Sequence, residues 1–168
     1  PRSQVTKQFV SAIIQMWNRV LGVTVAQQTL DFNKLQDLQT STKDNPKGLQ
    51  IWRAAWGSDY PDPQDWLSIF FQKGQDYNEQ NYGQNTSSDA AAQIQVQQML
   101  TAADINPDNT ARMKQYNEAE QTLVNDVAWI PIFQAASQYL VNPKVYNLKI
   151  NSLTEFPPDS WGNVYITA

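Results

Sequence analysis

The stretch LQIWRAAWGSDYPDP, residues 49–63, carries the strongest structural signal in this sequence. Its first half, residues 49–56, is apolar and rich in tryptophan, isoleucine and alanine, which favours a β-strand. The strand cannot continue beyond this point, because Pro61 and Pro63 flank a single residue and lack backbone donors. The stretch therefore predicts a hydrophobic strand that runs directly into a rigid, aromatic and acidic loop.

The alternation of side chains along a strand sorts residues 49–56 into two faces. Arg53 and Ala55 share one face, and the other face carries Trp52, Ala54 and Trp56. In open α/β sheets, ligands bind in the crevice beyond the carboxyl ends of the strands. The loop that follows Trp56 is therefore a candidate binding site.

The rest of the chain alternates between helical and strand-like patterns. Helices are expected over residues 4–21, 32–40, 64–71, 89–103 and 109–127, and further strands over 23–30, 129–133 and 138–141. Gly22 stands where a helix ends, and Asp31 can cap the next helix. Residues 72–88 read as a long polar loop, and residues 142–168 as an irregular tail with short β-like pieces. This order predicts an α/β fold, or α+β layers.

Composition excludes several classes of chemistry. The chain has no cysteine and no histidine, so thiolate nucleophiles, Cys/His zinc sites and imidazole bases are ruled out. The net charge is −4 without any Lys/Arg cluster, which argues against a nucleic-acid partner. No pattern for a cofactor is found, and the spacing of Asp59, Asp62 and Asp65 lacks the glycine of a calcium loop. We therefore expect neither a cofactor nor a metal.

Several stretches of the chain together resemble one family. These are WRAAWGSDYPDP (52–63), RMKQYNEAEQTLVND (112–126), AWIPI (128–132), and a start in which Gly22 leads into VTVA (23–26). They are similar, in order and spacing over nearly the whole chain, to the family 5 extracellular solute-binding proteins. These are the oligopeptide- and dipeptide-binding components of ABC importers.

The resemblance implies one lobe of a two-lobed, periplasmic-binding-protein-like fold, with a mixed sheet and flanking helices. Residues 1–168 would form this single carboxyl-proximal lobe of a larger receptor that closes on its ligand. Residues 142–168 would return toward the missing N-terminal lobe. The receptor would be extracytoplasmic, lipid-anchored through a missing N-terminus, and would deliver its solute to ABC permease subunits. Pro1, Arg2 and Ser3 stand directly before the first expected helix, so the lack of a targeting segment is uninformative.

The resemblance also assigns roles to individual residues. Asp59 matches the aspartate that pairs with the α-amino group of a bound peptide, and Trp56 matches a tryptophan that packs against ligand side chains. Arg53 falls where some members place an arginine near the peptide backbone or carboxylate. The bound peptide would lie extended along the loop, beside the remaining site residues Gly57, Ser58 and Tyr60. The pairing of Asp59 with a ligand ammonium group also has a physical reason apart from the family. An ammonium group enclosed in a cleft needs a compensating carboxylate.

Other interpretations of the same residues stay open. Asp59 could cap the turn before Pro61, and Asp62 and Asp65 could serve as turn and helix N-terminal residues. A carboxylate beside a tryptophan also suits an oligosaccharide or another solute. Asp59 and Asp62 could form the carboxylate pair of a glycoside hydrolase, although nothing marks either as a raised-pKa acid. A fourth possibility is a protein-interaction module that uses residues 72–88. The reading favoured here is a non-enzymatic receptor.

Overall fold

A computed structural model of the protein describes residues 4–167, so the expectations for Pro1, Arg2 and Ser3 lie outside the described residues. The chain divides into two compact units, Pro1–Leu35 and Gln36–Ala168. Each unit is described by itself. The single lobe over residues 1–168 stays a prediction.

The first unit is built on a long amphipathic helix. Helix α1 (Gln4–Leu21) coincides with the helix predicted over residues 4–21. Gly22 ends it with a positive φ of 68°, and its N–H donates to the carbonyl of Asn18 at 3.0 Å. Helix α2 (Phe32–Thr40) begins after Asp31, whose Oδ1 accepts the N–H of Lys34 at 2.9 Å. Local periodicity and capping residues thus located both helices correctly.

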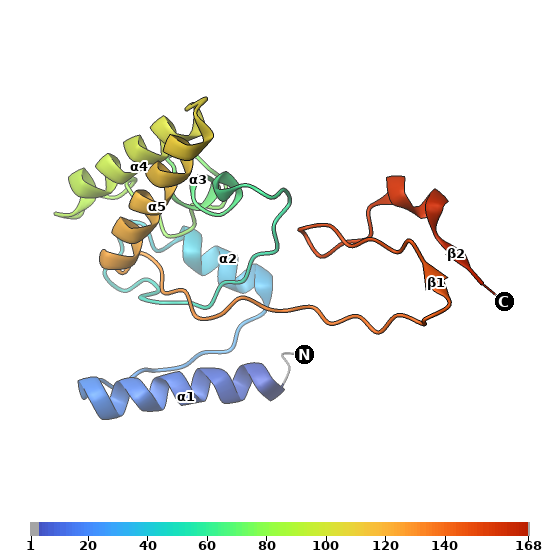
Figure 1. The fold of residues 1–168 in the computed structure, drawn as a ribbon. Helices are drawn as coiled ribbons and strands as arrows, with labels where there is room; N and C mark the ends of the chain where they lie inside the picture. Colours follow the sequence, from blue (N-terminus) through green and yellow to red (C-terminus); the bar gives the residue numbers. More distant parts are fainter. Residues whose placement is uncertain (1–3, 168) are drawn as a thin grey trace. The chain divides into compact units, whose positions relative to one another are not determined.

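The second unit is organised around a helical hairpin (Figure 1). Besides the end of α2, its helices are the 3₁₀ turn η1 (Pro63–Asp65), the short helix α3 (Ser68–Phe71), α4 (Ala90–Asp104), α5 (Asn109–Asn125) and, in the C-terminal segment, the 3₁₀ helix η2 (Pro158–Asn163). Helices α4 and α5 pack against each other, and α3 packs against α4. The single helix predicted over residues 64–71 is therefore divided into η1 and α3, and the helices predicted over 89–103 and 109–127 are confirmed.

The core of this unit lies between the hairpin, α3 and the loop that follows it. Apolar and aromatic side chains fill it, and all are nearly inaccessible to solvent: Leu67, Phe71, Tyr82, Val96, Leu100, Ala103, Tyr116, Ala119 and Leu123. Burial of these side chains supplies the main favourable free energy of folding in this region.

The loop of residues 72–88 is irregular but firmly held. The side-chain amide of Asn78 donates to the carbonyl of Tyr82 at 2.9 Å and accepts the N–H of Tyr82 at 2.9 Å. Gln97 of α4 donates to the carbonyls of Phe71 and Tyr82 at 2.8 and 2.7 Å. At Gly83, where φ is +64°, a Cβ would lie 2.6 Å from the Gln97 side chain. Buried amide side chains thus replace the hydrogen bonds that regular structure would supply.

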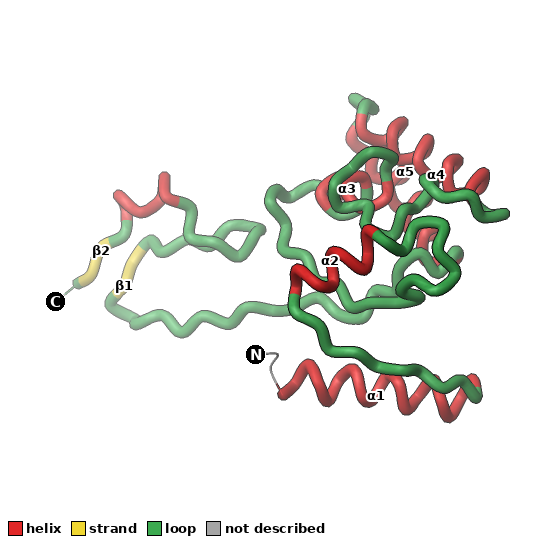
Figure 2. Tube along the Cα trace, turned by 180° about the vertical axis from the view of Figure 1, so that it is seen from behind, coloured by secondary structure: helices red, strands yellow, loops and turns green. Residues whose placement is uncertain are grey.

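The predicted α/β arrangement is observed only in part among the described residues. Residues 23–30, 49–56, 129–133 and 138–141 do not form strands. Strand pairing occurs only between β1 (Val145–Tyr146) and β2 (Tyr165–Ile166), which are antiparallel and drawn in yellow in Figure 2. A strand exists only through hydrogen bonds to a neighbour, and residues 50–58 and 134–141 have no backbone partner among the described residues. The described chain is therefore mostly helical, with one small two-stranded sheet.

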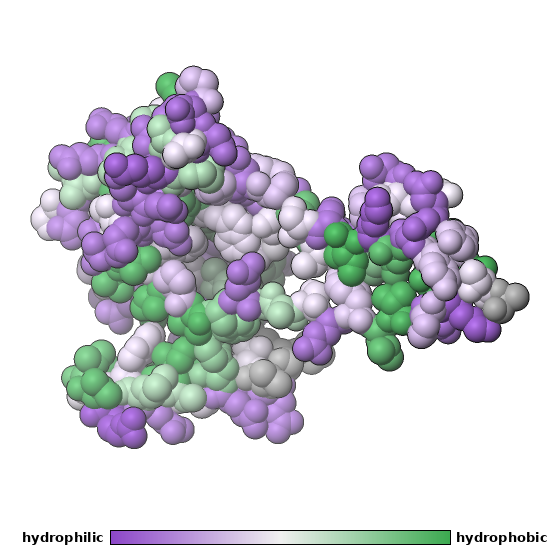
Figure 3. All heavy atoms as spheres, viewed as in Figure 1, coloured by the Kyte–Doolittle hydropathy of each residue, from purple (hydrophilic) through white to green (hydrophobic). Residues whose placement is uncertain are grey.

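The extended segments expose apolar side chains. Leu140 is fully exposed, and Ile51, Ile132 and Tyr139 are also open to solvent. Figure 3 shows green, hydrophobic side chains at the surface of the C-terminal segment. Within the part of the chain that the structure covers, no helix has the length and apolarity to cross a membrane.

Candidate functional site

The loop after residue 56 presents Asp59 to solvent. The residue is exposed, and its carboxylate has no hydrogen-bond or ion-pair partner among residues 4–167. Its backbone N–H, in contrast, donates to Oδ2 of Asp65 at 2.8 Å. The main chain at Asp59 is therefore fixed while its charged group is free to meet another molecule. This arrangement differs from a turn-capping aspartate, whose carboxylate would accept a local backbone N–H.

Both the indole N–H and the aromatic ring of Trp56 are fixed by neighbouring side chains. Its Nε1 donates to the same Oδ2 of Asp65 at 3.1 Å. Its ring makes edge contacts with Phe70 and Tyr77, at centroid distances of 5.2 and 4.8 Å. The side chain remains half-buried, so part of its surface is accessible while its orientation is fixed.

Among the other predicted site residues, Ser58 and Tyr60 form side-chain hydrogen bonds, whereas Gly57 and Arg53 form none within the described residues. Ser58 Oγ accepts the Nε1 hydrogen of Trp66 at 2.6 Å, and the Tyr60 hydroxyl donates to Gln64 Oε1 at 3.0 Å. At Gly57, no atom lies within 4 Å of the place that a Cβ would take. Arg53 is exposed and has no ion-pair partner within the described range. The structure thus gathers residues 56–60 into one loop with Arg53 on the extended segment before it.

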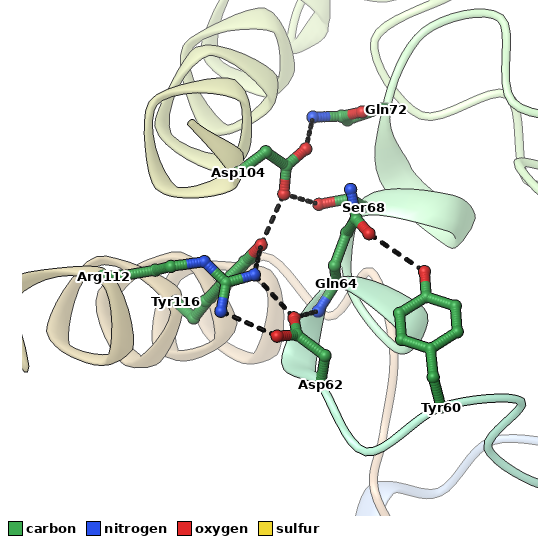
Figure 4. A network of polar contacts seen from close by, with 8 residues as sticks. All are labelled: Tyr60, Asp62, Gln64, Ser68, Gln72, Asp104, Arg112 and Tyr116. Atoms are coloured by element: carbon green, nitrogen blue, oxygen red, sulfur yellow. Dashed lines mark hydrogen bonds and ion pairs between the residues drawn. The ribbon is translucent and has the colours of Figure 1, made fainter. Parts of the chain in front are cut away.

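Asp62 caps the 3₁₀ turn η1, as predicted for a turn residue, and also pairs with a distant helix, which the sequence did not reveal (Figure 4). It forms a bidentate ion pair with Arg112 of α5, with both N–O distances at 2.7 Å, and its Oδ1 also accepts the N–H of Gln64 at 2.9 Å. The hydrogen bonds from Arg112, together with that from Gln64, lower the pKa of Asp62 below its ordinary value despite partial burial. A general acid in glycoside hydrolysis needs a raised pKa and a free proton. Asp62 is therefore unsuited to the acid role in a glycoside hydrolase.

The ion pair belongs to a network that joins the loop to the helices (Figure 4). Arg112 also donates to the hydroxyl of Tyr116 at 3.1 Å, and Tyr116 donates in turn to Asp104 at the end of α4. Asp104 further accepts hydrogen bonds from Ser68 and Gln72, each at 2.7 Å. Residues 62–72 are thereby tied to both helices of the hairpin.

The buried carboxylate of Asp65 was missed as a site residue. Asp65 does lie in the first turn of η1, as predicted, but its burial to 1% exposure and its contacts with Trp56 and Asp59 were not expected. Arg112 was also missed, because nothing in the sequence marks a contact between positions fifty residues apart. The local sequence shows only an aspartate two residues after the Pro61-Asp62-Pro63 turn, and this pattern does not indicate burial.

The electrostatic surroundings of the loop are negative. Burial raises the pKa of the Tyr60 phenol, and the nearby carboxylates of Asp65, Asp62, Asp104 and Asp59 raise it further. Such surroundings favour a cation over an anion as guest. Within residues 4–167, no group of three ligating side chains is placed to hold a metal ion.

The hollows of the second unit do not contain the loop. One, of about 220 Å³, is lined by Pro63, Trp66, Leu67, Glu120 and Trp129. Another, of about 170 Å³, lies between α4 and α5 and is lined by Met99, Ala102, Gln115 and Glu118. Neither is lined by Asp59, Trp56 or Arg53. The loop is therefore not part of either of these two hollows.

Two curated proteins are similar to most of the chain. A dipeptide-binding protein from Lactococcus lactis is 27% identical over 154 residues, which cover 89% of this chain and 25% of the relative. The periplasmic oligopeptide-binding protein OppA from Salmonella typhimurium is 25% identical over 143 residues, which cover 85% of this chain and 24% of the relative. No protein-family model matches the chain. The resemblance to peptide-binding proteins is thus confirmed, and the chain spans about a quarter of the length of these relatives.

Proposed function

We propose that these residues belong to an extracytoplasmic receptor of an ABC importer that binds peptides and delivers them to a membrane permease. Both relatives are named as binding proteins and not as enzymes, which supports a receptor without catalytic activity. In this proposal, the second lobe and a lipid anchor are supplied by chain outside these residues.

One observation carries the proposal: the unpartnered carboxylate of Asp59 on a main chain that is otherwise fixed. Its only described neighbour interaction is the backbone hydrogen bond to Asp65. A peptide α-ammonium that leaves water must gain a compensating negative charge, since a buried unpaired charge costs several kcal/mol. Asp59 can supply that charge without giving up an existing hydrogen bond.

The neighbouring residues suit an extended peptide with varied side chains. The exposed part of the Trp56 ring can bury apolar ligand surface without demanding one shape. Open space at Gly57 allows a peptide backbone to approach the loop closely, and Arg53 is free to meet the backbone or carboxylate. Ser58 and Tyr60 support the loop through Trp66 and Gln64. The opposite wall of the site would come from the second lobe, so closure of the two lobes would complete the burial of the ligand.

The proposal is tested with full-length protein and the di- to hexapeptide fraction of a casein digest. We expect the peptides to raise the melting temperature of the protein, because a ligand that binds only the folded state stabilises it. Asp59→Asn should weaken binding roughly 30-fold or more, which corresponds to about 2–5 kcal/mol for truncating one partner of a buried charge pair. N-acetylation of the peptides should weaken binding to the wild-type protein by a similar factor.

Asp37→Asn is the matched control. Asp37 is exposed on α2, and its carboxylate has no partner in the described range, so this substitution also removes one exposed negative charge. It should leave peptide affinity unchanged. Binding that survives Asp59→Asn, or that falls equally in Asp37→Asn, would contradict the ammonium contact. A melting-temperature shift caused by oligosaccharides and not by peptides would instead assign the receptor to sugars.

A further inference from the structure

The carboxylate of Asp65 contacts both residues that the proposed function places against the ligand. Its Oδ2 accepts the Nε1 hydrogen of Trp56 at 3.1 Å and the backbone N–H of Asp59 at 2.8 Å. One buried oxygen thus joins the aromatic wall of the site to the main chain that carries the ionic contact. Asp65 itself is 1% exposed and so cannot contact a ligand in solvent.

We propose that Asp65 is a positioning residue of the peptide site, which holds the main chain of Asp59 and the Trp56 ring in their binding positions before the ligand arrives. This inference rests on the proposed function. Asp65 acts through its two hydrogen-bond donors and makes no ligand contact of its own.

The position of Asp65 is itself determined by its surroundings. Its N–H donates to the carbonyl of Asp62 at 3.1 Å within η1, and Asp62 is fixed by the bidentate pair with Arg112. Two further hydrogen bonds, from Trp66 to Ser58 and from Tyr60 to Gln64, join the loop of residues 56–60 to residues 64–66. The support for the loop therefore runs from α5 through Arg112, Asp62 and Asp65.

Preorganisation explains why such support would affect affinity. A binding residue that is already ordered loses less conformational entropy when the ligand binds, so more of the interaction free energy appears as affinity. Hydrogen bonds to an ionised acceptor are about twice as strong as those between neutral groups. Asp65→Asn keeps the shape of the side chain but removes its charge. This substitution should loosen both donors without opening a cavity.

The test compares the affinity of full-length protein for the casein di- to hexapeptide fraction before and after N-acetylation. The ratio of the two affinities measures how well Asp59 recognises the free ammonium group. We expect Asp65→Asn to lower affinity for the free peptides roughly tenfold, the scale of one charged hydrogen bond, and to lower the ratio by a similar factor. Affinity for the acetylated peptides should change less.

Asp126→Asn is the matched structural control, because Asp126 also accepts a hydrogen bond from a core side chain, the Tyr82 hydroxyl at 2.9 Å, and is not part of the network that joins the loop to the helices. It should lower the melting temperature but keep the affinity ratio within about twofold of wild type. A general loss of stability affects the binding of free and acetylated peptides equally, so it cancels in the ratio. In the wild-type protein, the indole N–H of Trp56 should show slow hydrogen exchange that becomes faster in Asp65→Asn.

The outcomes separate this inference from the proposed function. A wild-type protein that binds no peptide, or binds acetylated peptides equally well, overturns both. A wild-type protein that discriminates free from acetylated peptides, with Asp65→Asn discriminating equally, overturns only the positioning role. Equal loss of discrimination in Asp126→Asn would also overturn it, because the effect would then reflect general loosening of the unit.

Discussion

Residues 49–58 and residues 59–72 are adjacent in the chain and differ in almost every physical respect. The backbone of residues 50–58 has no partner among the described residues, and most of its side chains are exposed. Residues 59–72 are bonded to η1, α4 and α5 by side chains whose partners lie up to fifty positions away. The site lies where these two regions meet. A rigid support on one side and an open segment on the other are what a surface needs if it is to accept a guest.

Among the tests of this comparison, the largest expected loss of stability comes from Leu100→Ala in α4. Leu100 is fully buried in the core, so truncation should cost about 2–5 kcal/mol of the free energy of unfolding through lost burial and a cavity. Leu140→Ala is the matched change, because Leu140 is fully exposed and should cost less than about 0.5 kcal/mol. Urea denaturation of the two variants measures both. Equal costs would show that the open segment is covered in solution, which would contradict the contrast drawn here.

The ion pair that holds the supported region should have a smaller effect. Arg112→Met should destabilise the protein by about 1.5–3 kcal/mol, the usual range for hydrogen bonds to a charged group. The hydrogen bonds from Arg112 keep the pKa of folded Asp62 below its unfolded value of about 3.9. The stabilisation is therefore fully present above about pH 4 and is lost as the pH falls through the lower folded pKa. Denaturation of both proteins between pH 7 and pH 2 should show the wild-type advantage shrinking on acidification. An advantage that is constant with pH would contradict the pairing.

Alanine substitutions at two glycines should have the smallest effects, one mainly on stability and the other mainly on peptide affinity. Gly83→Ala places a Cβ within 2.6 Å of Gln97 at a φ of +64°, and we expect a loss of about 1–3 kcal/mol in stability. Gly57→Ala meets no atom within 4 Å and should change stability by less than about 0.5 kcal/mol. Peptide affinity should follow the opposite order, with Gly57→Ala weakening binding and Gly83→Ala leaving it nearly unchanged. If Gly57→Ala binds peptides normally, the ligand backbone does not approach that position.

The sequence located the helices because their signals are local. The apolar spacing in residues 4–21, the cap at Asp31 and the glycine at position 22 are each read from a few neighbouring residues. The strands could not be located in the same way. Residues 49–56 have strand composition, but a strand also requires a partner, and composition does not show whether one is present.

The candidate site was accessible from the sequence only in part. The run from Trp56 to Tyr60 could be recognised because its residues are consecutive. The support provided by Asp65 and Arg112 depends on how a turn and a distant helix pack, and the sequence alone contains no record of that packing. Asp62 illustrates this limit: its role in the turn was predicted from neighbouring residues and is confirmed, whereas its ion pair with Arg112 on α5 was not predicted.

Residues 134–141 affect how readily newly made chains aggregate. They combine free backbone donors and acceptors with exposed apolar side chains, of which Leu140 is the most exposed. An edge of this kind pairs readily with a strand from another copy of the chain. A newly made chain is therefore most prone to aggregation while the backbone groups of this segment are unpaired.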